Sequence, residues 1–425
     1  MNIKVQSIRG MNDLLPSETH WWQAMERAIH HVAALYGYEE IRLPLLERTE
    51  LFKRSIGEET DIVEKEMYTF LDNRGDSLTL RPEATASCVR ACIQHGLINR
   101  SKARLWYMGP MFRYERPQKG RYRQFHQFGI EAFGWTTPDI DAEIILVAYA
   151  LWQQLNIADH AQLEINSIGT SNARQRYRAD LVSYFGKYRD SLDQDSQRRL
   201  VTNPLRILDS KNPDMQEIIE EAPVMTDYLD AESAARFDRL CNLLASQNIG
   251  FTINHRLVRG LDYYTDTVFE WTTNLLGAQN AICGGGRYDG LVELLGGGPI
   301  PGAGFAMGLE RLIEVLRQSD YDAELARPQV YVCTLGSDAE VEGLNLAQEL
   351  RAQGIRTTVH CGGGKLSQQL KNADRASAVL GVIIGADELA SRTVIVKSLR
   401  TAVEQQSILR SEIVETIEGM LHSKQ

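Results

Sequence analysis

The sequence lacks the patterns that mark several large classes of protein. Its six cysteines form no CxxC pair, and disulfide frameworks belong mainly to short secreted chains, so we expect neither a disulfide scaffold nor a zinc ribbon. No apolar run approaches the roughly 18 residues that a membrane span needs, which excludes a membrane partner. The first residues hold no apolar core of the kind found in signal peptides, so the sequence predicts a cytoplasmic protein.

An excess of positive charge is also missing. The chain has 46 Lys and Arg against 56 Asp and Glu, a formal charge of −10. Because phosphate binding needs concentrated basic residues, this total argues against a nucleic-acid partner. The distribution of charge is more informative. From Arg327 onward there are 11 basic and 11 acidic residues, so the whole negative charge belongs to residues 1–326.

A length of 425 residues predicts two or three domains. Residues 1–169 and 249–326 combine helical and strand patterns, whereas residues 170–248 are helical, charged and without strand patterns. From residue 327 to 425 strands and helices alternate, with the last helix expected at 407–422. We therefore predict an α+β domain built on an antiparallel sheet, a helical insertion, and a C-terminal α/β domain.

The most informative segment is the predicted hairpin at residues 111–133. Strand side chains alternate between faces, so Gln127 and Glu131 share the face of Phe125, opposite Phe128. A solvated sheet face is the ordinary explanation for such a polar pattern. The joining loop argues against it, because one acid, Glu115, accompanies five basic residues, a net charge of +4 over eleven residues: Arg113, Arg116, Lys119, Arg121 and Arg123.

This basic loop predicts an anion site. Two or more fixed guanidinium groups can hold a polyphosphate and stabilise charge developing at phosphorus. Phe125 beside them can stack an adenine. The common nucleotide loops are missing, because the chain has no GxxxxGK[ST], and its PGAGFAMG segment lacks the downstream acid of a dinucleotide site. A phosphate site on an antiparallel sheet is therefore expected.

Several motifs now carry a resemblance. F-R-Y-E at 112–115 resembles motif 2 of the class II aminoacyl-tRNA synthetases, and G-A-G-F-A-M-G-L-E-R-L at 302–312 resembles motif 3. The helix and strand that end at Pro44 resemble motif 1, a dimer element. Four further strings are similar to signatures of the histidyl-tRNA synthetase family: the N-terminal I-R-G-M-N-D-L-L-P, L-R-P-E at 80–83, R-G-L-D-Y-Y at 259–264 and G-G-G-R-Y-D-G-L at 284–291. The resemblance runs from residue 8 to the last strand. Ala84 departs from the glycine usual in that family.

The resemblance implies a class II catalytic domain and a C-terminal anticodon-binding domain in a homodimer. The implied reaction joins L-histidine to ATP, releases pyrophosphate, and transfers histidine to the 3′ end of tRNA(His). Mg²⁺ is expected on the ATP phosphates and no metal site on the protein. The implied catalytic residues are Arg259 and Arg113. The implied histidine ligands are Glu83, Thr85, Gln127, Glu131, Tyr264 and Tyr288. The implied ATP ligands are Arg113, Glu115, Arg121, Phe125 and Arg311, with Arg116 and Lys119 near the tRNA acceptor end.

Other interpretations remain open at this point. The chain can be a regulatory relative that binds histidine without charging tRNA, such as the synthetase-like subunit of ATP phosphoribosyltransferase, or another class IIa synthetase. The basic loop and the C-terminal domain argue against the first, and R-G-L-D-Y-Y argues against the second. Individual residues also have ordinary explanations. Arg311 can pair with Glu314 on a helix surface, and Arg259 can simply end a strand.

Overall fold

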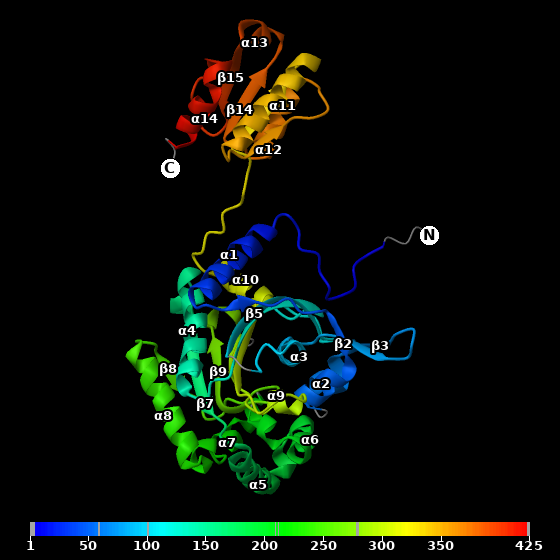
Figure 1. Ribbon diagram of the computed structural model, residues 1–425, viewed down its shortest axis with the longest axis vertical. Coiled ribbons are helices and arrows are strands. Elements are labelled where there is room, and N and C mark those ends of the chain that lie inside the picture. Colours follow the sequence, from blue (N-terminus) through cyan, green and yellow to red (C-terminus); the bar gives the residue numbers. More distant parts are fainter. Residues whose placement is uncertain are drawn as a thin grey trace. The chain divides into compact units, whose positions relative to one another are not determined.

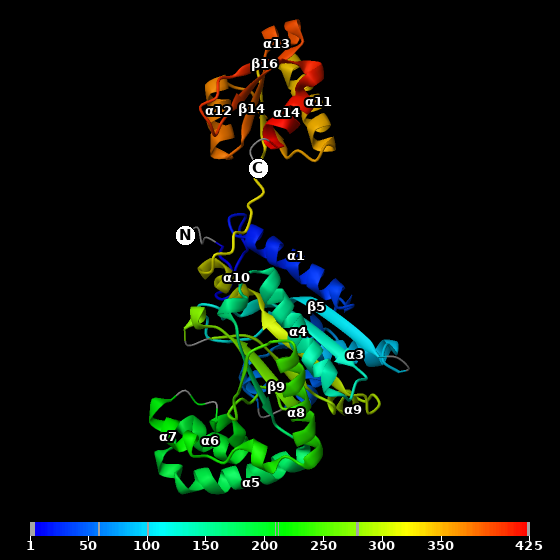
Figure 2. The ribbon, with the colours of Figure 1, turned by 90° about the vertical axis from the view of Figure 1, so that its left-hand side faces the viewer.

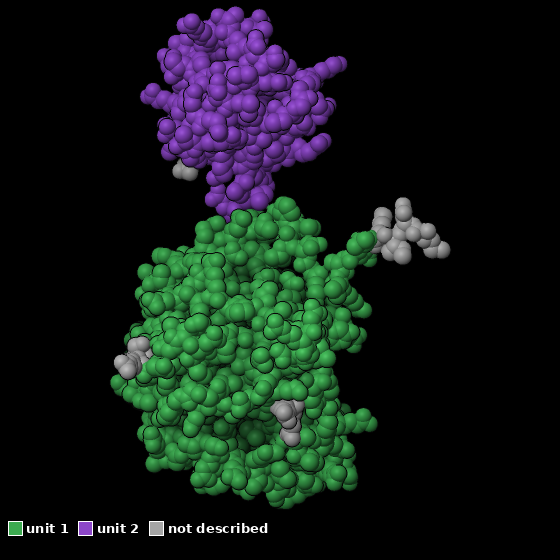
Figure 3. Space-filling view, turned by 45° about the vertical axis from the view of Figure 1, so that its right-hand side comes forward, with its two compact units in different colours: residues 1–323 green, residues 324–425 purple. Residues whose placement is uncertain are grey.

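The chain divides into two compact units, residues 1–323 and 324–425 (Figure 3). The computed structural model describes residues 5–57, 60–99, 102–208, 210, 212–277 and 280–422. Each unit buries a hydrophobic core of its own. The first unit contains both the predicted catalytic domain and the predicted helical insertion.

An eight-stranded sheet organises the first unit, in the order β1-β5-β6-β11-β10-β9-β7-β8. The edge strands β1 (Glu39–Glu40) and β8 (Phe251–Ile253) run parallel to their neighbours. The six strands between them are antiparallel, which confirms the sheet type predicted from the sequence. They are β5 (Ala103–Phe112), β6 (Gln124–Phe133), β7 (Gln162–Ser167), β9 (Thr265–Thr272), β10 (Ala281–Arg287) and β11 (Gly302–Gly308).

Helices cover both faces of this sheet (Figure 1, Figure 2). One face packs against α1 (Thr19–Leu35), α4 (Pro138–Gln154), α8 (Ala231–Ser246) and α10 (Leu309–Gln318) in the largest hydrophobic cluster. The other face packs against α3 (Thr85–His95) and α9 (Leu291–Leu294). A small sheet of β2 (Leu46–Arg48), β4 (Ser77–Leu80) and β3 (Tyr68–Leu71) lies beside α2 (Thr49–Ile56) and the turn η1 (Ile62–Glu66).

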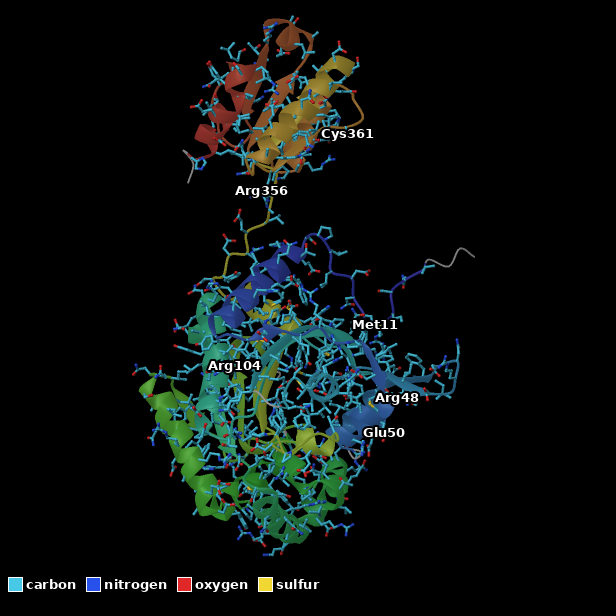
Figure 4. All side chains as sticks on the ribbon, in the orientation of Figure 1. Met11, Arg48, Glu50, Arg104, Arg356 and Cys361 are labelled. Atoms are coloured by element: carbon cyan, nitrogen blue, oxygen red, sulfur yellow. The ribbon has the colours of Figure 1, made fainter. Side chains whose placement is uncertain are left out.

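The β5–β6 hairpin shows the predicted alternation. Phe128 and Ile130 are buried in the cluster beneath α1 and α4, whereas Phe125 and Gln127 face the opposite side, toward a cavity. Arg104 on β5, labelled in Figure 4, forms an ion pair of 2.8 Å with Glu143 on α4. The sheet therefore offers one apolar face to the helices and one polar face to the site.

The segment between β7 and β8 is helical, as predicted. It contains α5 (Ser171–Lys187), α6 (Gln194–Thr202), α7 (Gln216–Glu220) and α8, joined by short turns that include η4 (Pro204–Ile207), and none of its described residues forms a strand. The first three helices enclose a cluster of their own around Tyr177, Leu181 and Phe185. The last helix, α8, buries Phe237 and Leu240 in the core of the large sheet.

The second unit is a five-stranded mixed sheet in the order β13-β12-β14-β15-β16. Its strands are β12 (Val330–Thr334), β13 (Thr357–Val359), β14 (Leu380–Ile384), β15 (Thr393–Ser398) and β16 (Gln406–Leu409), and its helices are α11 (Ser337–Ala352), α12 (Leu366–Arg375), α13 (Ala386–Ser391) and α14 (Ile413–His422). The helix predicted at 407–422 was wrong in its first residues. They form β16, because pairing with β15 overrides a weak local preference.

All six cysteines carry free thiols, including the exposed Cys361 labelled in Figure 4. Within the described part of the chain, no helix combines the length and hydropathy needed to cross a bilayer.

Candidate active site

A cavity of about 720 Å³ lies on the polar face of the large sheet. Its walls come from the β5–β6 hairpin, the start of α3, the loop between β8 and β9, the start of α10 and the helical segment after β7. The structure brings together most of the predicted site residues here. Those that line the cavity are Glu83, Thr85, Arg113, Glu115, Arg121, Phe125, Gln127, Arg259, Tyr264 and Arg311.

One end of the cavity, which we call the buried end, has Glu83, Thr85, Gln127 and Tyr264 in its wall, and behind this wall lies Glu131. Its carboxylate is 1% exposed and accepts hydrogen bonds from three hydroxyl groups. Thr85 Oγ1 donates to Oε1 at 2.7 Å and Tyr107 donates to the same oxygen at 3.1 Å. Tyr288 donates to Oε2 from the opposite side. Glu131 and Tyr288 thus lie directly behind Thr85 in the cavity wall.

Burial dominates the electrostatics of this end. Desolvation raises the pKa of Glu131 to about 8, although the three hydroxyl donors and their hydrogen bonds act in the opposite direction. Burial also raises the pKa of the Tyr288 and Tyr107 hydroxyls. These phenols therefore stay protonated and remain hydrogen-bond donors at neutral pH. With its pKa raised to about 8, the Glu131 carboxyl is largely protonated at neutral pH, and it can accept a polar hydrogen from a ligand once that proton is lost.

Glu83 lies at the beginning of α3. Its carboxylate accepts backbone N–H bonds from Thr85 at 2.7 Å and from Ala86 at 3.0 Å, so it occupies the positive end of the helix. Burial nevertheless raises its pKa. Ala84 between them has φ −119°, which any L-residue adopts, so the missing glycine costs no backbone strain.

Opposite the buried end is a cationic end formed by Arg113, Arg121, Arg259 and Arg311. The Arg113 guanidinium lies 5.3 Å from the ring centroid of Phe125, and its Nε donates to the Pro82 carbonyl. Arg121 lies 3.4 Å from Glu115. Guanidinium groups that converge on one space can bind a polyphosphate from several sides.

The two remaining arginines are fixed by the sheet. Arg259 NH1 donates to Glu270 Oε1 on β9 at 2.9 Å, and its Nε is buried without a hydrogen-bond partner among the described residues. Arg311 donates to the backbone carbonyls of Ala281 at 2.7 Å and Gly120 at 3.3 Å. The ordinary explanations considered for these two arginines do not describe the structure, because Arg259 lines the cavity and Glu314 pairs with Lys119.

Glycines make these close approaches possible. A Cβ at Gly284 on β10 would lie 2.3 Å from Arg259 NH1, and a Cβ at Gly304 on β11 would lie 2.1 Å from Glu131 Oε2. At Gly304 the added Cβ would also lie 2.2 Å from the Ile130 carbonyl oxygen, so the backbone would have to move, whereas at Gly284 it would displace the Arg259 guanidinium. Glycine at Gly284 and Gly304 thus lets the Arg259 and Glu131 side chains lie directly against the backbone of β10 and β11.

Four predicted residues do not line the cavity: Glu131 and Tyr288 lie behind its wall, and Arg116 and Lys119 lie outside it. Arg116 and Lys119 are exposed in the hairpin loop. Arg116 lines a second cavity of about 460 Å³ with Arg9, Tyr114 and Arg123. Lys119 forms its ion pair with Glu314 at 2.6 Å while its side chain stays 72% exposed. Both basic groups thus lie at the outer edge of the hairpin.

Three groups of functional residues were not predicted. Tyr107 on β5 resembled an ordinary apolar strand residue, although strand parity assigns it the same face as Arg113. No sequence pattern marks Glu270 as a site residue, because its ion pair with Arg259 depends on how the chain between the two residues folds. The helical segment contributes polar side chains to the cavity wall, and no local pattern marks them: Asp193, Asp195, Arg199, Ser210 and Asn212.

The fold and this site define the class. The antiparallel sheet, in which a cationic hairpin lies beside the G-A-G-F-A-M-G strand and the arginine that follows it, is that of a class II aminoacyl-tRNA synthetase catalytic domain. A family profile described as histidyl-tRNA synthetase matches residues 10–312, and one described as an anticodon binding domain matches residues 329–420. The chain belongs to the histidyl-tRNA synthetase family, and its activity is that of a histidine–tRNA ligase.

One solved structure supports this assignment, and two more distant ones show the same fold. The chain is 35% identical to apo histidyl-tRNA synthetase from S. aureus, covering 97% of this chain and 100% of that one, with a TM-score of 0.81. It shares the fold of histidyl-tRNA synthetase from Nostoc sp. at 21% identity, covering 98% and 99%, with a TM-score of 0.71. It also shares the fold of an ATP phosphoribosyltransferase regulatory subunit/histidyl-tRNA synthetase from Bacillus halodurans at 24% identity, covering 88% and 97%, with a TM-score of 0.65.

Proposed function

We propose that L-histidine binds at the buried end of the cavity and ATP at the cationic end, so that the histidine carboxylate meets the α-phosphate between them. The observation that carries this proposal is a single cavity that is lined by Glu83, Thr85 and Gln127 at the buried end and by the four arginines at the cationic end. The histidine carboxylate oxygen attacks the α-phosphorus and forms the P–O bond of the adenylate while pyrophosphate leaves. The 3′-terminal ribose hydroxyl of tRNA(His) then attacks the activated carbonyl and releases AMP.

For the imidazole ring, we assign Glu131, Tyr264 and Tyr288. A neutral imidazole has one donor and one acceptor. The Glu131 carboxylate accepts the ring N–H, the Tyr264 hydroxyl addresses the other nitrogen, and Tyr288 holds the carboxylate in place. An apolar side chain in this pocket would leave buried polar groups without partners. Such a site can discriminate by about 10⁴–10⁵ without editing.

We assign the α-ammonium group of histidine to Gln127, Glu83 and Thr85. The Gln127 Oε1 atom is buried and has no hydrogen-bond partner among the described residues. A buried acceptor of this kind costs free energy until a donor arrives. An ammonium group beside Gln127 and the Glu83 carboxylate supplies that donor and a compensating charge.

For ATP, Arg113 and Arg259 stabilise the charge that develops on the α-phosphate, and Arg121 binds the terminal phosphates. Arg311 covers the adenine against Phe125, and Glu115 accepts a hydrogen bond from the base. In-line displacement at phosphorus depends mostly on positioning and on such fixed positive charge. The support is the convergence of the four guanidinium groups on the same cavity.

We propose that Mg²⁺ binds with ATP rather than to a preformed protein site. Among the described residues, no cluster of three or more His, Cys, Asp or Glu suits a metal ion. Mg²⁺ prefers phosphate oxygens, water and one or two carboxylates, and Glu115 and Glu270 are two carboxylates that pair with arginines of the cationic end. When bound there, Mg²⁺ neutralises the pyrophosphate leaving group.

We further propose a cytoplasmic homodimer. The free thiols are typical of a reducing compartment. Apolar side chains remain exposed near the predicted dimer element, with Leu45 at 43%, Phe70 at 46% and Leu71 at 69%. Such side chains favour burial against a second copy. Light scattering should give twice the 47.9 kDa chain mass, and a monomer at micromolar concentration would contradict this part of the proposal.

The main test is ATP–pyrophosphate exchange measured with each of the twenty amino acids. We expect exchange with histidine alone, followed by charging of tRNA(His). Failure of histidine to support exchange would disprove the proposed arrangement of the site. Exchange with a second amino acid would show that the buried end is not built around the imidazole.

A further inference from the structure

The loop between β8 and β9 is held in place by the helical segment that follows β7. This loop carries Arg259 and Tyr264, and both side chains line the cavity. Its backbone belongs to no strand between residues 254 and 264. The loop therefore depends on other parts of the chain for the exact placement of its two functional side chains.

The first contact comes from α5. Arg174 NH1 donates to the backbone carbonyl of Tyr264 at 2.5 Å. The Arg174 side chain is desolvated there, which lowers its pKa, while the charges of Asp262 and Asp266 act in the opposite direction. A desolvated guanidinium that donates to the Tyr264 carbonyl restricts where the Tyr264 backbone, and with it the Tyr264 side chain, can lie.

Two further contacts come from the end of α6 and the turn η4. Arg206 NH2 donates to the Gly260 carbonyl at 3.2 Å, directly after Arg259. Asn203 Nδ2 donates to Asp262 Oδ1 at 3.2 Å. The helical segment thus contacts Gly260, Asp262 and Tyr264, which are alternate residues in the last part of the loop, and it also contacts His255 and Arg256 in the first part.

We propose that Arg206 and Arg174 are positioning residues for histidine activation, Arg206 acting through Arg259 and Arg174 acting through Tyr264. This inference rests on the roles proposed above for Arg259 and Tyr264. A catalytic group must be held within about 0.5 Å of its productive position. A hydrogen bond to the backbone at Gly260, next to Arg259, or at Tyr264 itself therefore affects how well these two side chains are placed. The helical segment then acts in adenylate formation itself, before any tRNA binds.

Loss of the Arg206 hydrogen bond and loss of the Arg174 hydrogen bond should affect different kinetic constants. Arg206→Met loosens the arginine that faces the α-phosphate, so we expect kcat of histidine-dependent exchange without tRNA to fall about tenfold, with KM for histidine within about twofold. Arg174→Met loosens the tyrosine that faces the imidazole, so we expect KM for histidine to rise about tenfold, with kcat within about threefold.

Arg178→Met is the matched control. Arg178 lies on the same helix as Arg174, but its NH2 donates to the Thr202 carbonyl at 2.6 Å, inside the helical segment. We expect both of its kinetic constants to stay within about twofold of the parent chain. Equal behaviour of all three variants would overturn the proposal. Parallel losses of kcat and of histidine affinity in both test variants would overturn it as well, because they indicate general loosening.

Lysine variants protect the test against a folding defect. Arg206→Lys and Arg174→Lys keep the charge and one donor, so each should recover part of the constant that its methionine variant lost. No recovery in well-folded lysine variants would overturn the proposal. Arg259→Ala and Tyr264→Phe are assayed in parallel. If those two leave exchange unchanged, the proposed site fails; if they impair exchange while Arg206→Met matches Arg178→Met, only the positioning role fails.

Discussion

The two ends of the cavity solve different physical problems. At the buried end, Glu131 is 1% exposed and its oxygens already accept three hydroxyl donors. At the cationic end, the side chains of Arg259 and Arg121 remain 20% and 43% exposed and pair with carboxylates. At the buried end, the Glu131 carboxyl group is desolvated and its oxygens have hydrogen-bond partners. At the cationic end, the Arg121 and Arg259 side chains are partly exposed and paired with carboxylates.

This difference follows the chemistry that each end must perform. Selecting one amino acid requires buried polar groups that penalise every wrong side chain, and such groups cost stability when they are charged. Holding a polyphosphate requires positive charge that can exchange one anionic partner for another. The carboxylates Glu115 and Glu270 serve as such partners for the arginines. We expect mutations at the two ends to differ in the same way.

The largest effect is expected at the cationic end. Arg259→Ala removes a fixed charge beside the α-phosphate, so we expect the rate of ATP–pyrophosphate exchange to fall about 10³-fold. Histidine binding, measured by calorimetry, should change little, because Arg259 does not contact the imidazole. Arg48→Ala, which removes an arginine that lies outside the cavity and pairs with Asp76 at 3.4 Å, is the control. A large loss of histidine affinity in Arg259→Ala would erase the distinction between the two ends.

At the buried end, we expect the cost of a desolvated carboxylate to appear in stability. The pKa of Glu131 is raised to about 8. Below the usual carboxyl pKa the group is protonated in both states and costs nothing. As pH rises toward 8, the unfolded chain loses a proton that the folded chain retains, so the parent chain loses stability relative to Glu131→Gln, which does not titrate. The difference should reach a few kcal/mol, on the order of one kcal/mol per pH unit.

Urea unfolding at pH 5.5 and pH 8.5 measures this difference. The gap between the parent chain and Glu131→Gln should widen in favour of the variant at the higher pH. The variant should also bind histidine poorly at both values. An unchanged gap would mean that Glu131 is already ionised at pH 5.5, and the buried end would then resemble the cationic end in its access to water.

A smaller effect is expected outside the cavity. Neutralising Arg116 and Lys119 together to Gln should reduce tRNA aminoacylation about tenfold while exchange changes less than about twofold, because these exposed groups are proposed to contact the acceptor end. Lys53 and Arg54, exposed on α2, provide a control with the same loss of charge. If exchange and aminoacylation decline equally, the hairpin loop belongs functionally to the cationic end.

The smallest effect concerns Tyr107. Tyr107→Phe removes one of the three donors to Glu131 at a cost of about 1 kcal/mol, so KM for histidine should rise about fivefold with kcat unchanged. Tyr36→Phe is the control. It removes a hydroxyl that lies just after α1 and donates to the carbonyl of Leu146 on α4. A drop in kcat instead would place Tyr107 in the chemical step rather than in histidine selection.

Much of the fold was predictable because it depends on short-range patterns. Alternation along β6 predicted which face carries Gln127 and which carries Phe128, and burial confirmed it. The change to alternating strands and helices predicted the C-terminal unit. The helix expected at 407–422 was partly wrong, because the edge of a sheet captured Gln406–Leu409. Edge pairing depends on a partner strand that local preference does not include.

The amino-acid sequence by itself determined the local chemistry, including the charge of the hairpin and the motifs that mark the family. The tertiary structure decided which groups meet. Tyr288 reaches Glu131 across 157 residues, and Thr85 reaches it across 46. The contacts of Arg174 and Arg206 with the β8–β9 loop likewise join separate segments. Desolvation and hydrogen-bond strength depend on distances in space, and folding alone brings these residues together and raises the pKa of Glu131.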